Sequence, residues 1–335
     1  MSELNLYPID YPFETLVARV DKKTLNLNPD FQRKYKWNRV DEKKTSKFIE
    51  SCLLRIPLPA CYFAEDENKH HIVIDGVQRI TTIVRFCNNE FCLEGLTQLR
   101  DLNGLYYRDL GDLKQDFDTY TIRCIILRKD NDRNLIKDIF SRLNQGAVEL
   151  TPQEVRHAIY PGDFDDMLHK MAKLPGVSLL SKTSNEDLEL DEIVLRYFAF
   201  KGDLSDYDGN IKEYLDTKME YFHSLTPSEV LNMQEEFKET LDKCISLFGL
   251  DKVFTDISKQ RKHRSVMLYD MLMWSMSRID ATVIESNKQK LLEKFEELCS
   301  SDEFKKTIAG GSQMKTQIEK RRTLWWRMIN EYSNL

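Results

Sequence analysis

The chain has 335 residues, of which 41% are hydrophobic and 31% charged, and its formal net charge is −6 at pH 7. This composition indicates a soluble globular protein of about two domains. No apolar run reaches the roughly 18 residues of a membrane span, and the N-terminus lacks the features of a secretory signal, so we expect a cytoplasmic protein without membrane contact. The acidic balance argues against a nucleic-acid binder with a basic surface throughout, although it is compatible with a local basic patch.

The seven cysteines are odd in number and scattered along the chain, mostly among apolar residues. They form no Cys-x-x-Cys pair, and none of the six histidines lies at ligand spacing from a cysteine. We therefore expect reduced thiols in the core rather than disulfides or a zinc site.

Alternating strand and helix patterns fill the first half of the chain. Residues 16–20 fit either a short strand or a helix. Strands are predicted, in chain order, at residues 59–64, 71–74, 90–93 (the weakest) and 120–127. Helices with one apolar face are predicted after Trp37, from about Ile80 onward, and at residues 132–143.

Nearly all of the second half has the pattern of helices. Thr151-Pro152-Gln153-Glu154 predicts a helix start, because it combines a threonine cap, a proline in the first turn and a glutamate that closes a capping box. Thr226-Pro227-Ser228-Glu229 repeats this pattern. Helices are predicted at residues 187–200, 226–248, 265–279, 291–299 and 316–332, and the very apolar 265–279 suits the centre of a bundle.

The predicted fold class is therefore α+β. Residues 1–150 are expected to form a small mixed-sheet domain, and residues 151–335 an all-α helical bundle.

The most informative stretch begins where a predicted strand ends at Asp75-Gly76 and a predicted helix follows. Such a corner has unpaired backbone N–H groups and the positive end of a helix dipole, which suit a phosphate. Arg79 adds a fork of donors that matches phosphate oxygens, and Asp75 could hold a metal ion or orient a water. The structural alternative is an ordinary strand–helix turn, with Asp75 as the helix cap and Arg79 on the surface.

Three ordered blocks of sequence carry a resemblance to a known family. The first is Pro-x-x-Gln-Arg-x-Tyr-x-Trp (residues 29–37), with Ile-Pro-Leu-Pro (56–59) after it. The second is Ile-Asp-Gly-Val-Gln-Arg (74–79). The third is Phe-x-x-x-Asn-x-Gly (140–146) with Leu-Thr-x-x-Glu (150–154). Together they resemble a bacterial domain-of-unknown-function family with an Asp-Gly-Gln-Gln-Arg signature and a fold like ParB and sulfiredoxin. That family forms the N-terminal half of GmrSD-type type IV restriction enzymes and related phage-defence proteins. In this chain, Val77 stands where the signature has its first glutamine.

The resemblance implies binding and hydrolysis of a nucleoside triphosphate, with Mg²⁺ as the expected cofactor, in the ParB-like domain. The implied catalytic residues are Asp75, Gln78 and Arg79, and Asp75 is the implied metal ligand. The implied nucleotide-binding residues are Gln32, Arg33, Tyr35, Trp37, Gly76 and Asn144. Tyr35 and Trp37 could equally be core residues, and Asn144 could simply cap its helix. A P-loop is absent, and the sulfiredoxin reaction is disfavoured because the phosphate loop has no cysteine.

The expected partners are a nucleotide, DNA, a separate nuclease and a second copy of the chain. A nuclease partner is expected because no His-Asn-His signature follows residue 160. DNA is expected at a basic C-terminal helix that carries Arg321, Arg322 and Arg327 beside two tryptophans. The alternative is a solvated basic face, with the tryptophans docked in the bundle.

Three functions remain open from the sequence. The first is a nucleoside triphosphatase in DNA-targeting phage defence. The second is a non-catalytic module that binds DNA or a nucleotide, which the missing motif glutamine favours. The third is a ParB-like nuclease. The sequence favours it less, because no cluster of carboxylates that could bind metal surrounds Asp75.

Overall fold

A computed structural model describes residues 4–27, 42–66, 69–131, 135–136, 139, 151–181, 188–259 and 263–332. The chain divides into two compact units, residues 1–150 (unit 1) and residues 151–335 (unit 2). Each has a hydrophobic core of its own. A small mixed sheet in unit 1 followed by helices in unit 2 confirms the predicted α+β class.

Unit 1 is built on a five-stranded sheet in the order β1-β5-β3-β4-β2. The strands are β1 (Leu6–Pro12), β2 (Leu25–Asn26), β3 (Cys61–Glu65), β4 (His71–Asp75) and β5 (Thr121–Leu127). Pairs β1–β5 and β3–β4 are antiparallel, whereas β3–β5 and β2–β4 are parallel. In this order, β3 and β4 lie inside the sheet. The predicted corner is at the end of β4.

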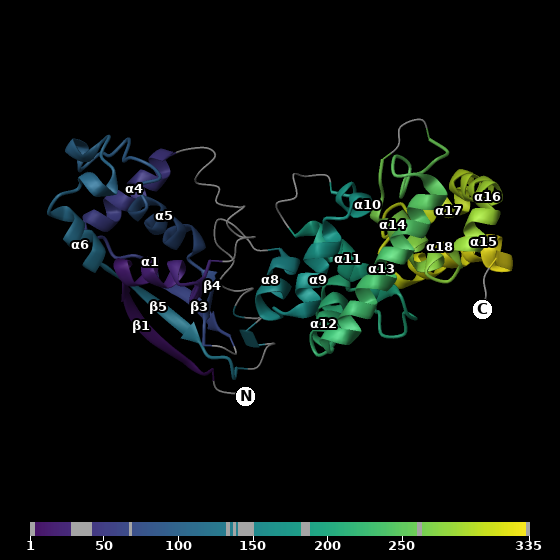
Figure 1. The fold of residues 1–335 in the computed structure, drawn as a ribbon, viewed down its shortest axis with the longest axis horizontal. Helices are drawn as coiled ribbons and strands as arrows, with labels where there is room; N and C mark the ends of the chain where they lie inside the picture. Colours follow the sequence, from purple (N-terminus) through teal and green to yellow (C-terminus); the bar gives the residue numbers. More distant parts are fainter. Residues whose placement is uncertain are drawn as a thin grey trace. The chain divides into compact units, whose positions relative to one another are not determined.

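Helices cover one face of this sheet (Figure 1). They are α1 (Phe13–Asp21), α4 (Glu42–Leu53), α5 (Val77–Cys87) and α6 (Leu113–Thr119), and two 3-10 turns lie at Arg100–Leu102 and Tyr107–Asp109. Burial alternates along β3: Cys61 and Phe63 are fully buried, whereas Tyr62 and Ala64, which follow each of them, are half-buried. Side chains alternate between the two faces of a strand, so every second residue of β3 enters the core.

The sequence patterns predicted most elements of unit 1. The hairpin β3–β4 and strand β5 are confirmed, and residues 16–20 are helical. The weak strand expected at residues 90–93 is wrong, because this segment has irregular backbone with a bend at Phe91. Strand β1 was not predicted, since Pro8 and Pro12 interrupt its apolar pattern. The predicted helix at residues 132–143 lies mostly outside the described residues.

Helices make up unit 2 in its described residues, apart from connecting segments and one isolated β-bridge between Thr255 and Arg264. Its helices are α8 (Pro152–Ile159), α9 (Asp163–Ala172), α10 (Pro175–Ser178), α11 (Glu189–Phe200), α12 (Ile211–His223), α13 (Pro227–Phe248), α14 (Val266–Met276), α15 (Ala281–Ser286), α16 (Lys288–Ser300), α17 (Asp302–Thr307) and α18 (Lys315–Ile329), followed by a 3-10 turn at Asn330–Tyr332. Both predicted capping boxes form, at Thr151 and Thr226. Helix α14 buries residues around most of its circumference, as expected for a central helix.

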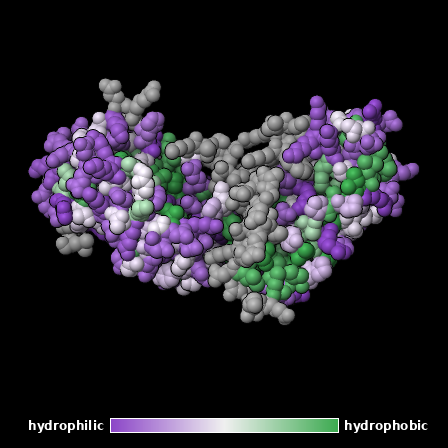
Figure 2. All heavy atoms as spheres, turned by 180° about the vertical axis from the view of Figure 1, so that it is seen from behind, coloured by the Kyte–Doolittle hydropathy of each residue, from purple (hydrophilic) through white to green (hydrophobic). Residues whose placement is uncertain are grey.

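The face seen in Figure 2 is predominantly polar. Hydrophilic residues cover most of the face seen in Figure 2, and hydrophobic residues form separate smaller patches on it. None of the helices in the described part of the chain has the combination of length and apolar character that crossing a bilayer requires.

Candidate phosphate-binding site

The corner between β4 and α5 has the conformation that close approach of a ligand to the backbone requires. Asp75 ends β4, and Gly76 follows with φ of 103° in the left-handed region, where residues with a Cβ are strained. A Cβ at position 76 would also overlap the Cys61 sulfur on β3. Two independent features therefore require glycine at this position: the positive φ angle and the close approach of Cys61 on β3.

The N-terminus of α5 opens directly from this corner. Its cap is Gly76, which has no side chain to accept a hydrogen bond, and the first helical bond runs from Ile80 N to Gly76 O over 2.9 Å. The N–H groups of the first turn therefore have no acceptor within the helix, and the dipole adds partial positive charge. This arrangement suits an anion, as the sequence predicted.

Arg79 is the third residue of α5, in its first turn, and is mostly buried, with 14% of its side chain exposed. Its Nη2 donates to Asp75 Oδ2 over 2.6 Å, and both Nη atoms lie 3.3 Å from Ala60 O. Nη1 also donates to Pro59 O. Two details of the structural alternative differ from the structure: the helix cap is Gly76 rather than Asp75, and Arg79 is mostly buried and paired with Asp75 rather than on the surface.

Asp75 is the more exposed partner of this pair, with 42% of its side chain accessible. Among the described residues, Arg79 binds its Oδ2. The described residues contain no group of three or more His, Cys, Asp or Glu side chains arranged to hold a metal. A single carboxylate still fits Mg²⁺, because this ion commonly takes one or two protein carboxylates and completes its shell with phosphates and water.

The structure brings together Asp75, Gly76, Gln78 and Arg79 at one corner. Gln78 is half-buried, and its backbone oxygen accepts from Thr82 Oγ1 over 2.7 Å. The other predicted binding residues, Gln32, Arg33, Tyr35, Trp37 and Asn144, lie outside the described residues. The convergence of the two Gln-Arg pairs on one pocket stays a prediction.

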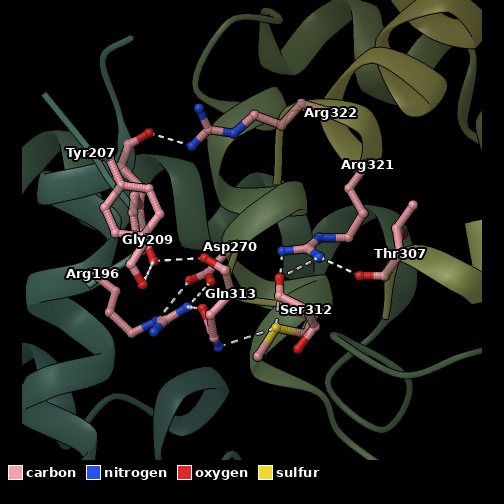
Figure 3. Close-up of polar contacts among 11 residues, drawn as sticks. Arg196, Tyr207, Gly209, Asp270, Thr307, Ser312, Gln313, Arg321 and Arg322 are labelled. Carbon is pink, nitrogen blue, oxygen red and sulfur yellow. Dashed lines mark hydrogen bonds and ion pairs between the residues drawn. The ribbon is translucent and has the colours of Figure 1, made fainter. Parts of the chain in front are cut away.

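The basic C-terminal helix differs from the expectation for two of its three arginines. Arg321 is 1% exposed and Arg322 is 7% exposed, so neither can contact DNA in this structure. Arg321 Nη1 donates to Thr307 O over 2.6 Å and to Ser312 O over 2.9 Å (Figure 3). Arg327 is exposed. The composition of the segment could not reveal this, since it does not say which face of α18 meets the core.

Arg322 closes the C-terminal end of α11. Its Nη2 donates to Phe200 O, and its Nη1 lies 3.5 Å from Gly202 O. Arg278 Nη2 donates to Lys201 O over 2.7 Å beside them. The last carbonyls of a helix carry partial negative charge, so cations are favoured there. Burial lowers the pKa of Arg322 to about 10, which leaves it charged at neutral pH.

A buried ion pair lies next to these arginines. Arg196 Nε donates to Asp270 Oδ1 over 3.2 Å, its Nη2 contacts Asp270 Oδ2, and the same Nη2 donates to Gln313 Oε1 over 3.0 Å (Figure 3). Burial opposes the charge on Arg196, but Asp270 more than offsets this and raises the pKa of the guanidinium. The group fixes α11, α14 and the segment before α18 in one arrangement.

Sequence reasoning missed two further kinds of polar site. Glu50 of α4 is buried and accepts the backbone N–H groups of Thr97, Gln98 and Leu99 over 2.9, 2.7 and 2.9 Å. In unit 2, His157 pairs with buried Asp165, and His169 Nδ1 lies 3.2 Å from Asp191 Oδ2. No spacing along the chain links these partners, whereas the i,i+4 spacing of Asp75 and Arg79 could have predicted their ion pair.

Comparison with known proteins connects unit 1 to one family. Residues 13–161 match the family model described as the GmrSD restriction endonuclease, N-terminal domain. A search of curated proteins and a search of solved structures found no match to the chain. The matched range contains α1, strands β2 to β5 and the whole β4–α5 corner. This part of the chain is therefore similar to the N-terminal domain of a restriction endonuclease.

Proposed function

We propose that unit 1 binds a nucleoside triphosphate with Mg²⁺ at the β4–α5 corner and hydrolyses it. The observation that carries the proposal is the corner itself: a left-handed glycine, an uncapped helix N-terminus, and an exposed carboxylate held by a buried arginine. The match over residues 13–161 supports a restriction-related role. Hydrolysis would then serve phage defence directed at foreign DNA, with a separate nuclease as partner.

Each group at the corner has a distinct part in the proposed reaction. The first N–H groups of α5, with Gln78, bind phosphate oxygens, and Gly76 lets the backbone come close. Asp75 would hold Mg²⁺, which would supply positive charge to neutralise the phosphoryl group. Arg79 places a fixed positive charge beside this carboxylate. Gln32, Arg33, Tyr35, Trp37 and Asn144 complete the proposed nucleotide site.

The test measures phosphate release from each nucleoside triphosphate, with and without Mg²⁺. The Asp75→Ala variant is expected to lose turnover by at least about 100-fold, because a metal ion contributes several kcal/mol to such reactions. Asp10→Ala is a matched control: Asp10 is similarly exposed (46%) and also pairs with an arginine, Arg123, at 3.0 Å, but it lies on β1. Equal turnover in both variants and the wild type would exclude Asp75 from catalysis.

A second function, binding without turnover, is favoured by one feature of the motif. Val77 replaces the glutamine expected at the first position of α5, which removes an amide from the corner. If unit 1 only binds, nucleotide should raise the melting temperature of the protein, and no phosphate should be released. The same two measurements on the wild type therefore separate the two functions.

A further inference from the structure

The guanidinium of Arg79 is engaged by the protein itself. Its two Nη atoms donate hydrogen bonds to the carboxylate of Asp75 and to the backbone carbonyls of Pro59 and Ala60. Only 14% of the side chain is exposed. A phosphate that bound either Nη atom would have to displace one of these acceptors. Asp75 is more accessible, with 42% of its side chain exposed, and among the described residues Arg79 binds only its Oδ2.

The acceptors of Arg79 belong to the two strands that shape the corner. Pro59 and Ala60 lead directly into β3, whose first residue, Cys61, packs against Gly76. Asp75 is the last residue of β4, on the other side of Gly76. Arg79 therefore ties the entrance of β3 and the end of β4 to the first turn of α5.

We infer that Arg79 is a positioning residue, which fixes Asp75 with Oδ1 directed to Mg²⁺ and does not itself bind the phosphates. This inference rests on the proposed function and assigns the role of one residue within it. Groups that hold a metal ligand in place change metal affinity when they are removed. Groups that bind a phosphate change the affinity for the nucleotide that carries it.

The experiment compares these two effects in Arg79→Gln. Positioning predicts that the Mg²⁺ concentration for half-maximal turnover rises by about 10- to 100-fold. The ratio of the ATP and AMP dissociation constants, measured without Mg²⁺, stays within about threefold of the wild type. Arg79→Lys keeps a charge for Asp75 but lacks the planar fork for both carbonyls, so it restores the Mg²⁺ dependence only in part.

Arg85→Gln is the matched control for loss of an arginine from α5. Its side chain is 12% exposed and bonds to Glu90 over 2.9 Å in the last turn, away from the corner. This variant should keep the wild-type Mg²⁺ dependence. Circular dichroism verifies folding of every variant, and direct Mn²⁺ binding provides a second readout of the site at Asp75.

Two outcomes would overturn the inference, and they are distinguishable. If the wild type turns over nucleotide and Arg79→Gln weakens ATP selectively by about 10-fold or more, with unchanged Mg²⁺ dependence, then Arg79 binds phosphate directly. If the wild type neither binds Mn²⁺ nor hydrolyses any nucleotide, the proposed function fails, and the role of Arg79 fails with it.

Discussion

Arg196 and Asp270 face each other in the core of unit 2, with Arg196 Nε 3.2 Å from Asp270 Oδ1 and both side chains at most 5% exposed. Arg321 and Arg322 are buried nearby, so Asp270 is the acid that faces a local excess of positive charge. Its loss would leave these charges without compensation in a region of low dielectric constant.

Asp270→Asn is therefore expected to destabilise the protein by about 3–5 kcal/mol, as is found when one partner of a buried ion pair is removed. Urea unfolding followed by circular dichroism measures the change. Glu331→Gln is the control, because its ion pair with Lys294 is largely exposed and such pairs contribute at most about 1 kcal/mol. A loss of under 1 kcal/mol in Asp270→Asn would contradict the role assigned to this carboxylate.

Glu50 should make the stability of unit 1 depend on pH. Burial opposes ionisation of this carboxyl, but the three backbone N–H donors outweigh it and hold its pKa below the ordinary 4.5. Its contribution is therefore complete above pH 4.5 and is lost as pH falls through the lowered pKa. Glu50→Gln should cost about 1–3 kcal/mol at pH 7 and progressively less in acid. A wild-type advantage that grows as pH falls below 4.5 would be the wrong sign.

Gly76→Ala tests how tightly the corner is built. Both the positive φ angle and the overlap with Cys61 oppose a methyl group, so we expect a loss of about 3 kcal/mol or more. Gly104→Ala separates the two causes, because Gly104 also has a positive φ of 85° but nothing lies within 4 Å of its added Cβ. That control should cost about 1 kcal/mol. Equal losses in both variants would show that Cys61 does not restrict position 76.

Arg322 and Arg327 lie on the same helix but should respond differently to substitution. Arg322→Met removes the cation that closes the end of α11 and should lower stability by about 2 kcal/mol. Arg327→Ala should leave stability unchanged within about 0.5 kcal/mol, since this side chain is exposed.

If α18 contacts DNA, the salt dependence of DNA binding should decrease by about one unit of slope in Arg327→Ala. Fluorescence anisotropy across a salt series measures this slope, and an unchanged slope would argue against that contact.

Local chemistry predicted much of the fold, because the deciding interactions are close along the chain. The capping boxes at Thr151 and Thr226 form within four residues, and the branched residues of β5 need only a core on one side. The corner at Asp75-Gly76 was predictable for the same reason. What failed depended on distant partners: β1 becomes a strand by pairing with β5, more than a hundred residues later.

The candidate site shows the same division. The sequence identified Asp75, Gly76 and Arg79, but it could not reveal that the carbonyls of Pro59 and Ala60 bind Arg79. Likewise, it counted the arginines of α18 as surface charge, because only the packing of α18 determines that Arg321 and Arg322 turn inward.

The hydrogen bond from Arg322 to the C-terminal end of α11 also constrains the order in which unit 2 can assemble. Helix α11 is central to this core, yet the guanidinium that closes its last turn comes from residue 322, more than a hundred positions later. During synthesis, the carbonyls at residues 200 and 202 must remain solvated until α18 is available. A ribosome-bound chain that stops before residue 315 would thus hold an incomplete core, and such intermediates are the ones expected to recruit chaperones.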